Sequence, residues 1–115
     1  MTSPSVTTKV YLFHGAGSTF TNAVFSSRPA AAAWIARHKL TGILTAYTID
    51  DPDFDRHQRE SKLPLKVRNE PNISADFIQR YAAGNEHTHY YYGLGEGDEG
   101  HSQAADQWHK DNSHA

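Results

Sequence analysis

The sequence predicts an α+β fold: a mainly antiparallel sheet of about four strands, two or three helices packed on one face, and a flexible C-terminal tail. Short runs rich in β-branched and aromatic residues recur along the chain, and residues 24–47 read as strand end, capped helix, tight turn and strand. A length of 115 residues suits one domain. We therefore expect a loose leader over residues 1–8, one domain over residues 9–93 and a flexible acidic tail over residues 94–115.

The first predicted element is a β-hairpin. Residues 9–14, KVYLFH, are mostly β-branched or aromatic and alternate in the way of a strand that packs on both faces. Residues 15–18 contain two glycines that suit a turn, and residues 19–26 return as a second strand.

The predicted helix over residues 28–39 has local signals at both ends. Ser27 has the side chain and position expected of an N-cap, Pro29 lies in the first turn, and Gly42 can take a positive φ in the turn that follows. A strand is expected over residues 43–49. Four residues of the helix have the spacing i, i+3, i+4 and i+7 and form a stripe that should face the sheet: Ala31, Trp34, Ile35 and His38.

The second half of the domain shows the same kinds of signal. Asp51 and Pro52 indicate the start of a short helix that ends near Ser61. Ser74 caps a further helix, whose apolar residues share one face. The other expected elements are a connection over residues 62–73, with a short extended piece at 65–67, and a last strand over residues 86–92.

Composition excludes several classes of function. The chain has no cysteine, so we expect no disulfide, thiolate metal site or thiol nucleophile. A net charge of −2 does not favour nucleic acid as the main partner. No run approaches the length of a membrane span and the N-terminus does not resemble a signal peptide, so we expect no membrane association and a cytoplasmic location.

Five short motifs together carry a family resemblance: Phe13-His14-Gly15, Val24-Phe25-Ser26-Ser27, Ala33-Trp34-Ile35, the run from Leu40 to Tyr47, and His87-Thr88-His89-Tyr90. With them the chain resembles a family of small bacterial proteins of unknown function, over roughly residues 9–93. The small size and α+β form are similar to those of immunity proteins of bacterial toxin systems. The resemblance implies a fold of that kind and no particular chemistry.

The strongest chemical signal is the pair His87 and His89. Two imidazoles two residues apart on a strand point to the same face and can reach one metal ion. His14 is the candidate third ligand, with His38 or Glu86 behind it. Such a site would suit zinc or iron. The alternative interpretation is that these histidines are ordinary polar residues on the surface of a sheet.

Two further groups suggest a binding surface. An acidic cluster can attract a cationic partner or bind Ca²⁺ or Mg²⁺, but it lacks the glycine and spacing of a calcium loop, and helix capping explains some of its members. Tyrosines at the end of the last strand are of the kind enriched at interfaces. The candidate partner-binding residues are Asp50, Asp51, Asp53, Asp55, Tyr90, Tyr91 and Tyr92.

No catalytic set is complete. The turn after His14 lacks the lysine and the following helix of a phosphate-binding loop, and no serine lies in a nucleophile elbow. We therefore expect no catalytic residues and no cofactor, and predict a small cytoplasmic bacterial protein-binding module, immunity-like, that occludes or inhibits a protein partner. The alternative hypothesis is a metal-dependent enzyme or metal sensor that uses His14, His87 and His89.

Overall fold

The computed structural model describes residues 8–82 and 85–113, which form two compact units. The sheet unit comprises residues 8–47 and 85–113, and the helical unit comprises residues 48–82. Residues 1–7 of the predicted leader and the last two residues of the chain lie outside the described residues.

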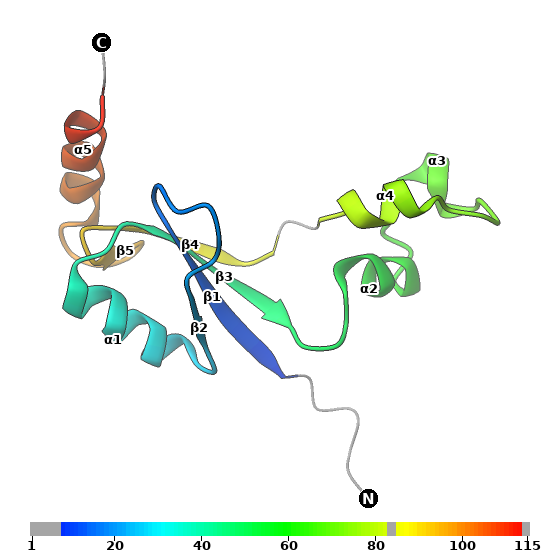
Figure 1. The fold of residues 1–115 in the computed structure, drawn as a ribbon, viewed down its shortest axis with the longest axis horizontal. Helices are drawn as coiled ribbons and strands as arrows, with labels where there is room; N and C mark the ends of the chain where they lie inside the picture. Colours follow the sequence, from blue (N-terminus) through cyan, green and yellow to red (C-terminus); the bar gives the residue numbers. More distant parts are fainter. Residues whose placement is uncertain (1–7, 83–84, 114–115) are drawn as a thin grey trace, which may run out of the picture. The chain divides into compact units, whose positions relative to one another are not determined.

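The sheet unit is built on a five-stranded antiparallel sheet with the strand order β2-β1-β3-β4-β5 (Figure 1). The α+β class is confirmed, with five strands in place of about four. The bounds are β1 (Lys9–Gly15), β2 (Ala23–Phe25), β3 (Gly42–Thr48), β4 (His87–Tyr91) and β5 (Leu94–Gly95). The predicted second strand over residues 19–26 is thus shorter, because Asn22 closes a loop in which its side chain accepts a hydrogen bond from the Gly15 N–H at 3.1 Å.

Helix α1 (Arg28–His38) confirms the helix predicted over residues 28–39. The Ser27 hydroxyl accepts a hydrogen bond from the Ala30 N–H at 3.2 Å, as an N-cap does. The helix ends differently from the prediction: Lys39 takes the left-handed conformation at φ 54°. Gly42 does not have a positive φ; it lies on β3, where a side chain would collide with the carbonyl oxygen of His14.

Replacing Lys39 with glycine should stabilise the sheet unit. A non-glycine residue in the left-handed region costs about 1 kcal/mol, and glycine is the preferred residue just beyond a helix C-terminus. Lys39→Gly is therefore expected to raise the free energy of unfolding by about 0.5–1 kcal/mol, measured by urea denaturation. Ala36→Gly, inside the same helix, is the control and should lower it. A loss of stability in Lys39→Gly would contradict the assignment of the cap.

The core of the sheet unit lies between α1 and one face of the sheet. Its buried side chains are Phe13, Ala31, Ile35, Leu44 and Tyr90. Ala31 and Ile35 are fully buried, so the predicted stripe of α1 does face the sheet. His38, at the end of that stripe, is exposed and stacks edge-on against Trp34 at a centroid distance of 5.5 Å.

The predicted flexible tail holds β5 and a helix, α5 (His101–Asp111), in its described part. Residues 101, 104, 105 and 108 of this helix are half-buried, a stripe with the i, i+3, i+4, i+7 spacing. Trp108 packs against Tyr91 of β4 at a ring-centroid distance of 5.8 Å. Strand alternation puts Tyr91 and the core residue Tyr90 on opposite faces of the sheet. The prediction that the helices pack on one face is therefore wrong, because α1 and α5 contact opposite faces.

The helical unit contains α2 (Asp53–Arg59), α3 (Leu65–Arg68) and α4 (Ala75–Arg80). Phe54 and Leu63 are its buried residues, and the rings of Phe77 and Tyr81 pack edge-on against Phe54. The Ser74 cap is confirmed, since its hydroxyl accepts the Phe77 N–H at 3.1 Å. The short extended piece predicted at residues 65–67 is wrong, because those residues form α3.

Candidate functional site

The sheet has an inner face, which packs on α1, and an outer face. The register pairs Leu12 with Val24 and Ile43 with His89, and each neighbours a core residue along its strand. These four side chains therefore lie on the outer face. We define the outer face by Leu12, His14, Val24, Ile43, Thr45, Tyr47, His87, His89 and Tyr91.

A pocket of about 330 Å³ lies on this outer face. The glycine-containing turn over residues 15–18 forms one side, Ile43 and Tyr91 belong to the strands, and Trp108 of α5 contributes an indole ring. His14 and His89 supply its imidazoles. The described residues that line the pocket include no Lys, Arg, Asp or Glu, so its lining is aromatic, aliphatic and backbone with few polar groups. Such a lining is typical of small-ligand sites.

Gly42 explains how the turn comes close enough to form the pocket. A Cβ at this position would lie 2.6 Å from the Phe13 ring and 2.9 Å from the Gly15 Cα. The Ala16 N–H donates to the Thr41 carbonyl at 2.9 Å, which fixes the turn against the start of β3. The close approach of β1 and β3 therefore requires glycine at residue 42.

Hydrogen bonds orient two of the three predicted metal ligands. His14 Nε2 donates to the Ser18 carbonyl at 2.7 Å, and His87 Nδ1 donates to the Asn85 carbonyl at 2.9 Å. The rings of His87 and His89 are neighbours, with centroids 5.2 Å apart. His14 and His89 both line the pocket, whereas His87 is not among its lining residues.

No three histidine, aspartate or glutamate side chains gather into a group able to hold a metal ion in the described part of the chain. Glu86, expected behind the histidines, forms an ion pair with Arg28 at 3.3 Å. His38 stacks on Trp34 on α1. Metal binding by His14, His87 and His89 stays a prediction, and His87 and His89 are the pair that the strand brings together.

The three predicted binding tyrosines have different environments. Tyr90 is 5% exposed and belongs to the core, which corrects its place among the candidate partner-binding residues, and burial raises the pKa of its hydroxyl. Tyr91 lies beneath α5, in contact with the rings of His101, Trp108 and His109. Tyr92 follows the strand with φ 51°, is 37% exposed, and donates a short hydrogen bond from its hydroxyl to Asp111.

The bond between Tyr92 and Asp111 should make the docking of α5 depend on pH. It raises the pKa of Tyr92 and, with Gln107, lowers the pKa of Asp111. Because the pKa of Asp111 is lowered, its contribution to the stability of the docked helix is present above about pH 4 and is lost as pH falls further. Because the pKa of Tyr92 is raised, its contribution is present below about pH 10 and is lost as pH rises through the raised value. We therefore expect hydrogen-exchange protection of the α5 amides to fall below about pH 4.

Tyr92→Phe is expected to lower α5 protection at neutral pH and to weaken its acid dependence. Asp106→Asn is the matched control, because Asp106 is an exposed acid on the same helix. Unchanged protection in Tyr92→Phe would show that the hydroxyl does not help to dock the helix.

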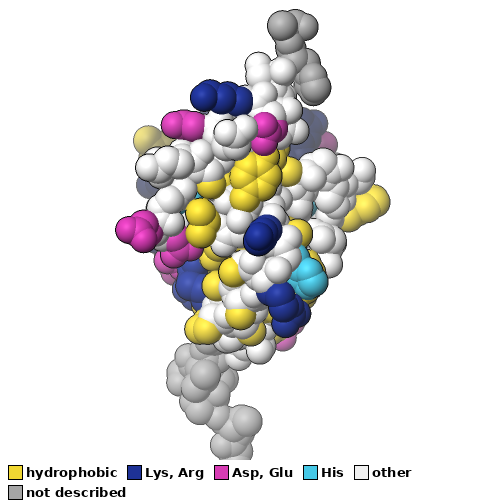
Figure 2. Space-filling model, turned by 90° about the vertical axis from the view of Figure 1, so that its left-hand side faces the viewer, with side chains coloured by type: hydrophobic (Ala, Val, Ile, Leu, Met, Phe, Trp, Pro, Cys, Tyr) yellow, Lys and Arg dark blue, Asp and Glu magenta, His cyan; other side chains and the backbone are white. Residues whose placement is uncertain are grey.

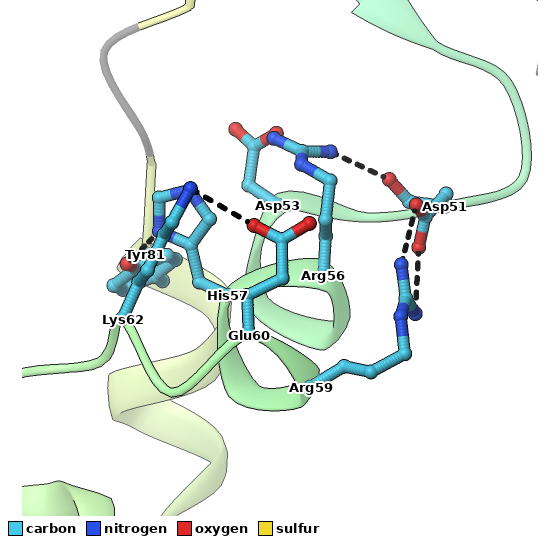
Figure 3. A network of polar contacts seen from close by, with 8 residues as sticks. All are labelled: Asp51, Asp53, Arg56, His57, Arg59, Glu60, Lys62 and Tyr81. Carbon is cyan, nitrogen blue, oxygen red and sulfur yellow. Dashed lines mark hydrogen bonds and ion pairs between the residues drawn. The ribbon is translucent and has the colours of Figure 1, made fainter.

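All four predicted aspartates belong to the helical unit, and two of them form ion pairs with arginines (Figure 3). Arg59 donates to both carboxylate oxygens of Asp51, at 3.3 and 3.0 Å, and Asp51 raises the pKa of Arg59. Arg56 pairs with Asp53 at 2.9 Å. Asp51 is therefore not the predicted cap: α2 starts after Pro52 without a side-chain cap.

Asp50 and Asp55 are exposed, whereas Asp51 and Asp53 are half-buried. The acidic and tyrosine groups thus lie in different units. Figure 3 also shows the ion pair of Lys62 with Glu60 and the hydrogen bond between Tyr81 and His57 Nδ1. Lys62 lies 3.0 Å from the Glu60 carboxylate and lowers the pKa of Glu60. The Tyr81 hydroxyl lies 2.7 Å from His57 Nδ1. The eight polar side chains drawn in Figure 3 thus have partners within the helical unit.

Sequence reasoning did not find the pocket. Its lining comes from β1, the turn after it, β3, β4 and α5, which are far apart along the chain. The available signal was the helical spacing i, i+3, i+4, i+7 of His101, Ala104, Ala105 and Trp108, which puts Trp108 on one stripe with two alanines. On the side of the molecule that carries α1 and α5, hydrophobic side chains are visible between scattered charged ones (Figure 2).

The fold and the site define a small α+β protein with an antiparallel sheet and a histidine-containing aromatic pocket on the outer face of that sheet. The chain belongs to the family of a domain of unknown function, DUF7710, whose model matches residues 10–96. The expected membership of an uncharacterised family is thus confirmed. The match includes all five strands except the first residue of β1, Lys9, and α5 with Trp108 follows it. No curated protein and no solved structure matches the chain.

None of the helices in the described part of the chain has the length and apolar character that crossing a membrane requires.

Proposed function

We propose that this protein is a protein-binding module whose partner docks on the outer face of the sheet. The observation that supports it most is the exposure of apolar side chains on that face: Val24 is 64% exposed, Tyr47 41% and Ile43 37%. Apolar groups that gather on one face of a soluble domain are typical of interaction surfaces. Tyrosine is also among the residues enriched in the centres of interfaces.

The proposal moves the expected surface away from most of the acidic residues. Asp51 and Asp53 are held by Arg59 and Arg56, so binding through them would first cost those ion pairs. Asp50 and Asp55 are exposed and can attract a cationic partner. The partner-binding set of the outer face thus centres on Val24, Ile43 and Tyr47. Asp50 and Asp55 form a separate electrostatic set in the helical unit.

The same proposal gives the protein an inhibitory role of the immunity type, in the cytoplasm of a bacterium. Its small size and α+β form support this, together with the absence of a recognisable catalytic set in the sequence. An inhibitor of this kind occludes a partner by shape and charge and needs no chemistry of its own.

Site-specific photocrosslinking in cells that naturally express the chain tests the proposal. A photoreactive benzophenone amino acid at residue 24 or 47 is expected to give one discrete adduct with a protein partner. The matched control is residue 37, an exposed position on α1, which should give none. Tyr47→Lys should abolish the adduct formed from residue 24. Equal adducts from residue 37, or none from either outer-face position, would refute the proposed surface.

The metal hypothesis has one observation in its favour, the adjacent rings of His87 and His89. The hydrogen bond from His87 Nδ1 leaves Nε2 as the nitrogen that can bind a metal. Elemental analysis of untagged protein decides between the two proposals. Stoichiometric zinc or iron that disappears in both His87→Ala and His89→Ala, but not in His38→Ala, would support a metalloprotein. Metal content unaffected by these substitutions would reject it.

A further inference from the structure

We propose that the outer-face pocket binds an uncharged aromatic ring that carries an N–H or O–H donor, as in a phenol or an indole. This goes beyond the proposed function, because it concerns a ligand of the free protein and does not require a protein partner. The size of the pocket, its lining and the hydrogen bond that orients His14 favour such a ligand.

Size and lining define the shape and charge of the ligand. A volume of about 330 Å³ is at the small end for ligand sites, which suits one or two fused rings. Tyr91 and Trp108 offer aromatic surfaces, and Ile43 offers an aliphatic one. Aromatic rings pair with one another in offset or edge-on geometry, which adds about 0.5–1.5 kcal/mol to the burial of their surface. The pocket should therefore prefer a flat aromatic ring to a saturated one.

The charge of the lining argues against an ionised ligand. No Lys, Arg, Asp or Glu is found among the described residues of the lining, so a carboxylate or an ammonium group would lose water without gaining an opposite charge. Arg28 bonds to Thr88 and pairs with Glu86, and none of these three residues lines the pocket.

His14 determines which polar group the ligand needs. Its Nε2–H donates to the Ser18 carbonyl at 2.7 Å, and this fixes the proton of the neutral ring on Nε2. Nδ1 then carries a lone pair and can only accept a hydrogen bond. His14 lines the pocket, so a ligand that donates an O–H or N–H can bond to this nitrogen, whereas a ligand with acceptors alone cannot.

Titration of the isotopically labelled full-length protein with p-cresol tests the site by two-dimensional NMR. A ligand of this size should bind with a Kd on the order of 1 mM. The shifts should occur at the amides of residues 15–18 and at the Trp108 indole N–H. The indole N–H of Trp34, which belongs to the inner side of the sheet, should not move.

Three small molecules separate the parts of the argument. 4-Methylcyclohexanol keeps the donor and lacks the aromatic ring, 4-methylanisole keeps the ring and lacks the donor, and 4-methylbenzoate adds a charge. Each should bind about tenfold more weakly than p-cresol. Equal affinity for 4-methylanisole and p-cresol would overturn the role of His14 Nδ1, and equal affinity for 4-methylbenzoate would overturn the requirement for a neutral ligand.

Variants test the place of binding. Ile43→Trp should fill the pocket and His14→Ala should remove the acceptor, and each is expected to weaken p-cresol binding about tenfold. His38→Ala is the matched control, since it removes an exposed histidine from α1. Retained spectral dispersion shows that the variants fold. Binding that survives both Ile43→Trp and His14→Ala, or no binding of p-cresol at all, would exclude the site.

The same ring chemistry can come from a free small molecule or from a tyrosine side chain of a protein. N-acetyltyrosinamide distinguishes these sources, because its backbone groups must remain outside the pocket. Binding comparable to that of p-cresol indicates a side-chain source, and binding of p-cresol alone indicates a free molecule. Loss of the photocrosslinked partner has no bearing on these titrations, so the two proposals fail independently.

Discussion

Leu44→Ala is expected to lower the free energy of unfolding of the sheet unit by about 2–5 kcal/mol, the range for removing a large aliphatic side chain from a core. Leu44 is 1% exposed and belongs to the buried cluster with Phe13, Ile35 and Tyr90. Removing its side chain leaves a cavity that its neighbours can only partly fill. Urea denaturation followed by circular dichroism measures the change.

Ile43→Ala is the control for that prediction, because it removes an aliphatic side chain from the adjacent position of the same strand. Ile43 is 37% exposed on the outer face, so we expect its loss to cost at most about 1 kcal/mol. A shift of the β3 register by one residue would exchange the two positions. A larger cost for Ile43→Ala than for Leu44→Ala would therefore show that the register is wrong.

Gly42→Ala is expected to destabilise the same unit by about 1–3 kcal/mol or more, as overpacking does. The added Cβ would meet the carbonyl oxygen of His14 and lie 2.9 Å from the Gly15 Cα. These are backbone atoms, so no side-chain rotation can relieve the contact. The turn over residues 15–18 must shift instead, and p-cresol binding should weaken together with stability.

Gly15→Ala gives the comparison. A Cβ at this position meets Asn22 and Phe13 side-chain atoms at 3.5 Å, an ordinary van der Waals distance. We expect a change within about 0.5 kcal/mol. Equal losses in the two variants would mean that the steric requirement at Gly42 has been misassigned.

Several elements could be predicted because their signals are local. Ser27 and Ser74 cap their helices through bonds to backbone groups three residues away, and the capping side chains are visible in the sequence. The strand over residues 87–91 follows from its run of aromatic and β-branched residues. Such features depend on neighbours along the chain, so the order of the residues suffices to predict them.

Other predictions were wrong where a contact with a residue distant in the sequence decides the conformation. Asp51 has the position of a helix cap, but the side chain of Arg59, eight residues on, binds both of its carboxylate oxygens. Gly42 suggested a positive φ and instead permits the close approach of β1. The acidic, polar composition of residues 94–115 suggested a flexible tail, whereas Trp108 and Tyr92 fix α5 to β4 and the residue after it.

By itself the sequence determined the α+β class, the position of α1 and the division of each strand into two sets of alternating side chains. Only the tertiary structure decided which set is buried: Tyr90 lies in the core, while Tyr91 and His89 line an outer pocket to which Trp108 also contributes. The physical reason is that strand alternation distinguishes two faces without ranking them. Which face loses its water depends on helices that follow or precede the strand by many residues, and their docking is a property of the whole unit.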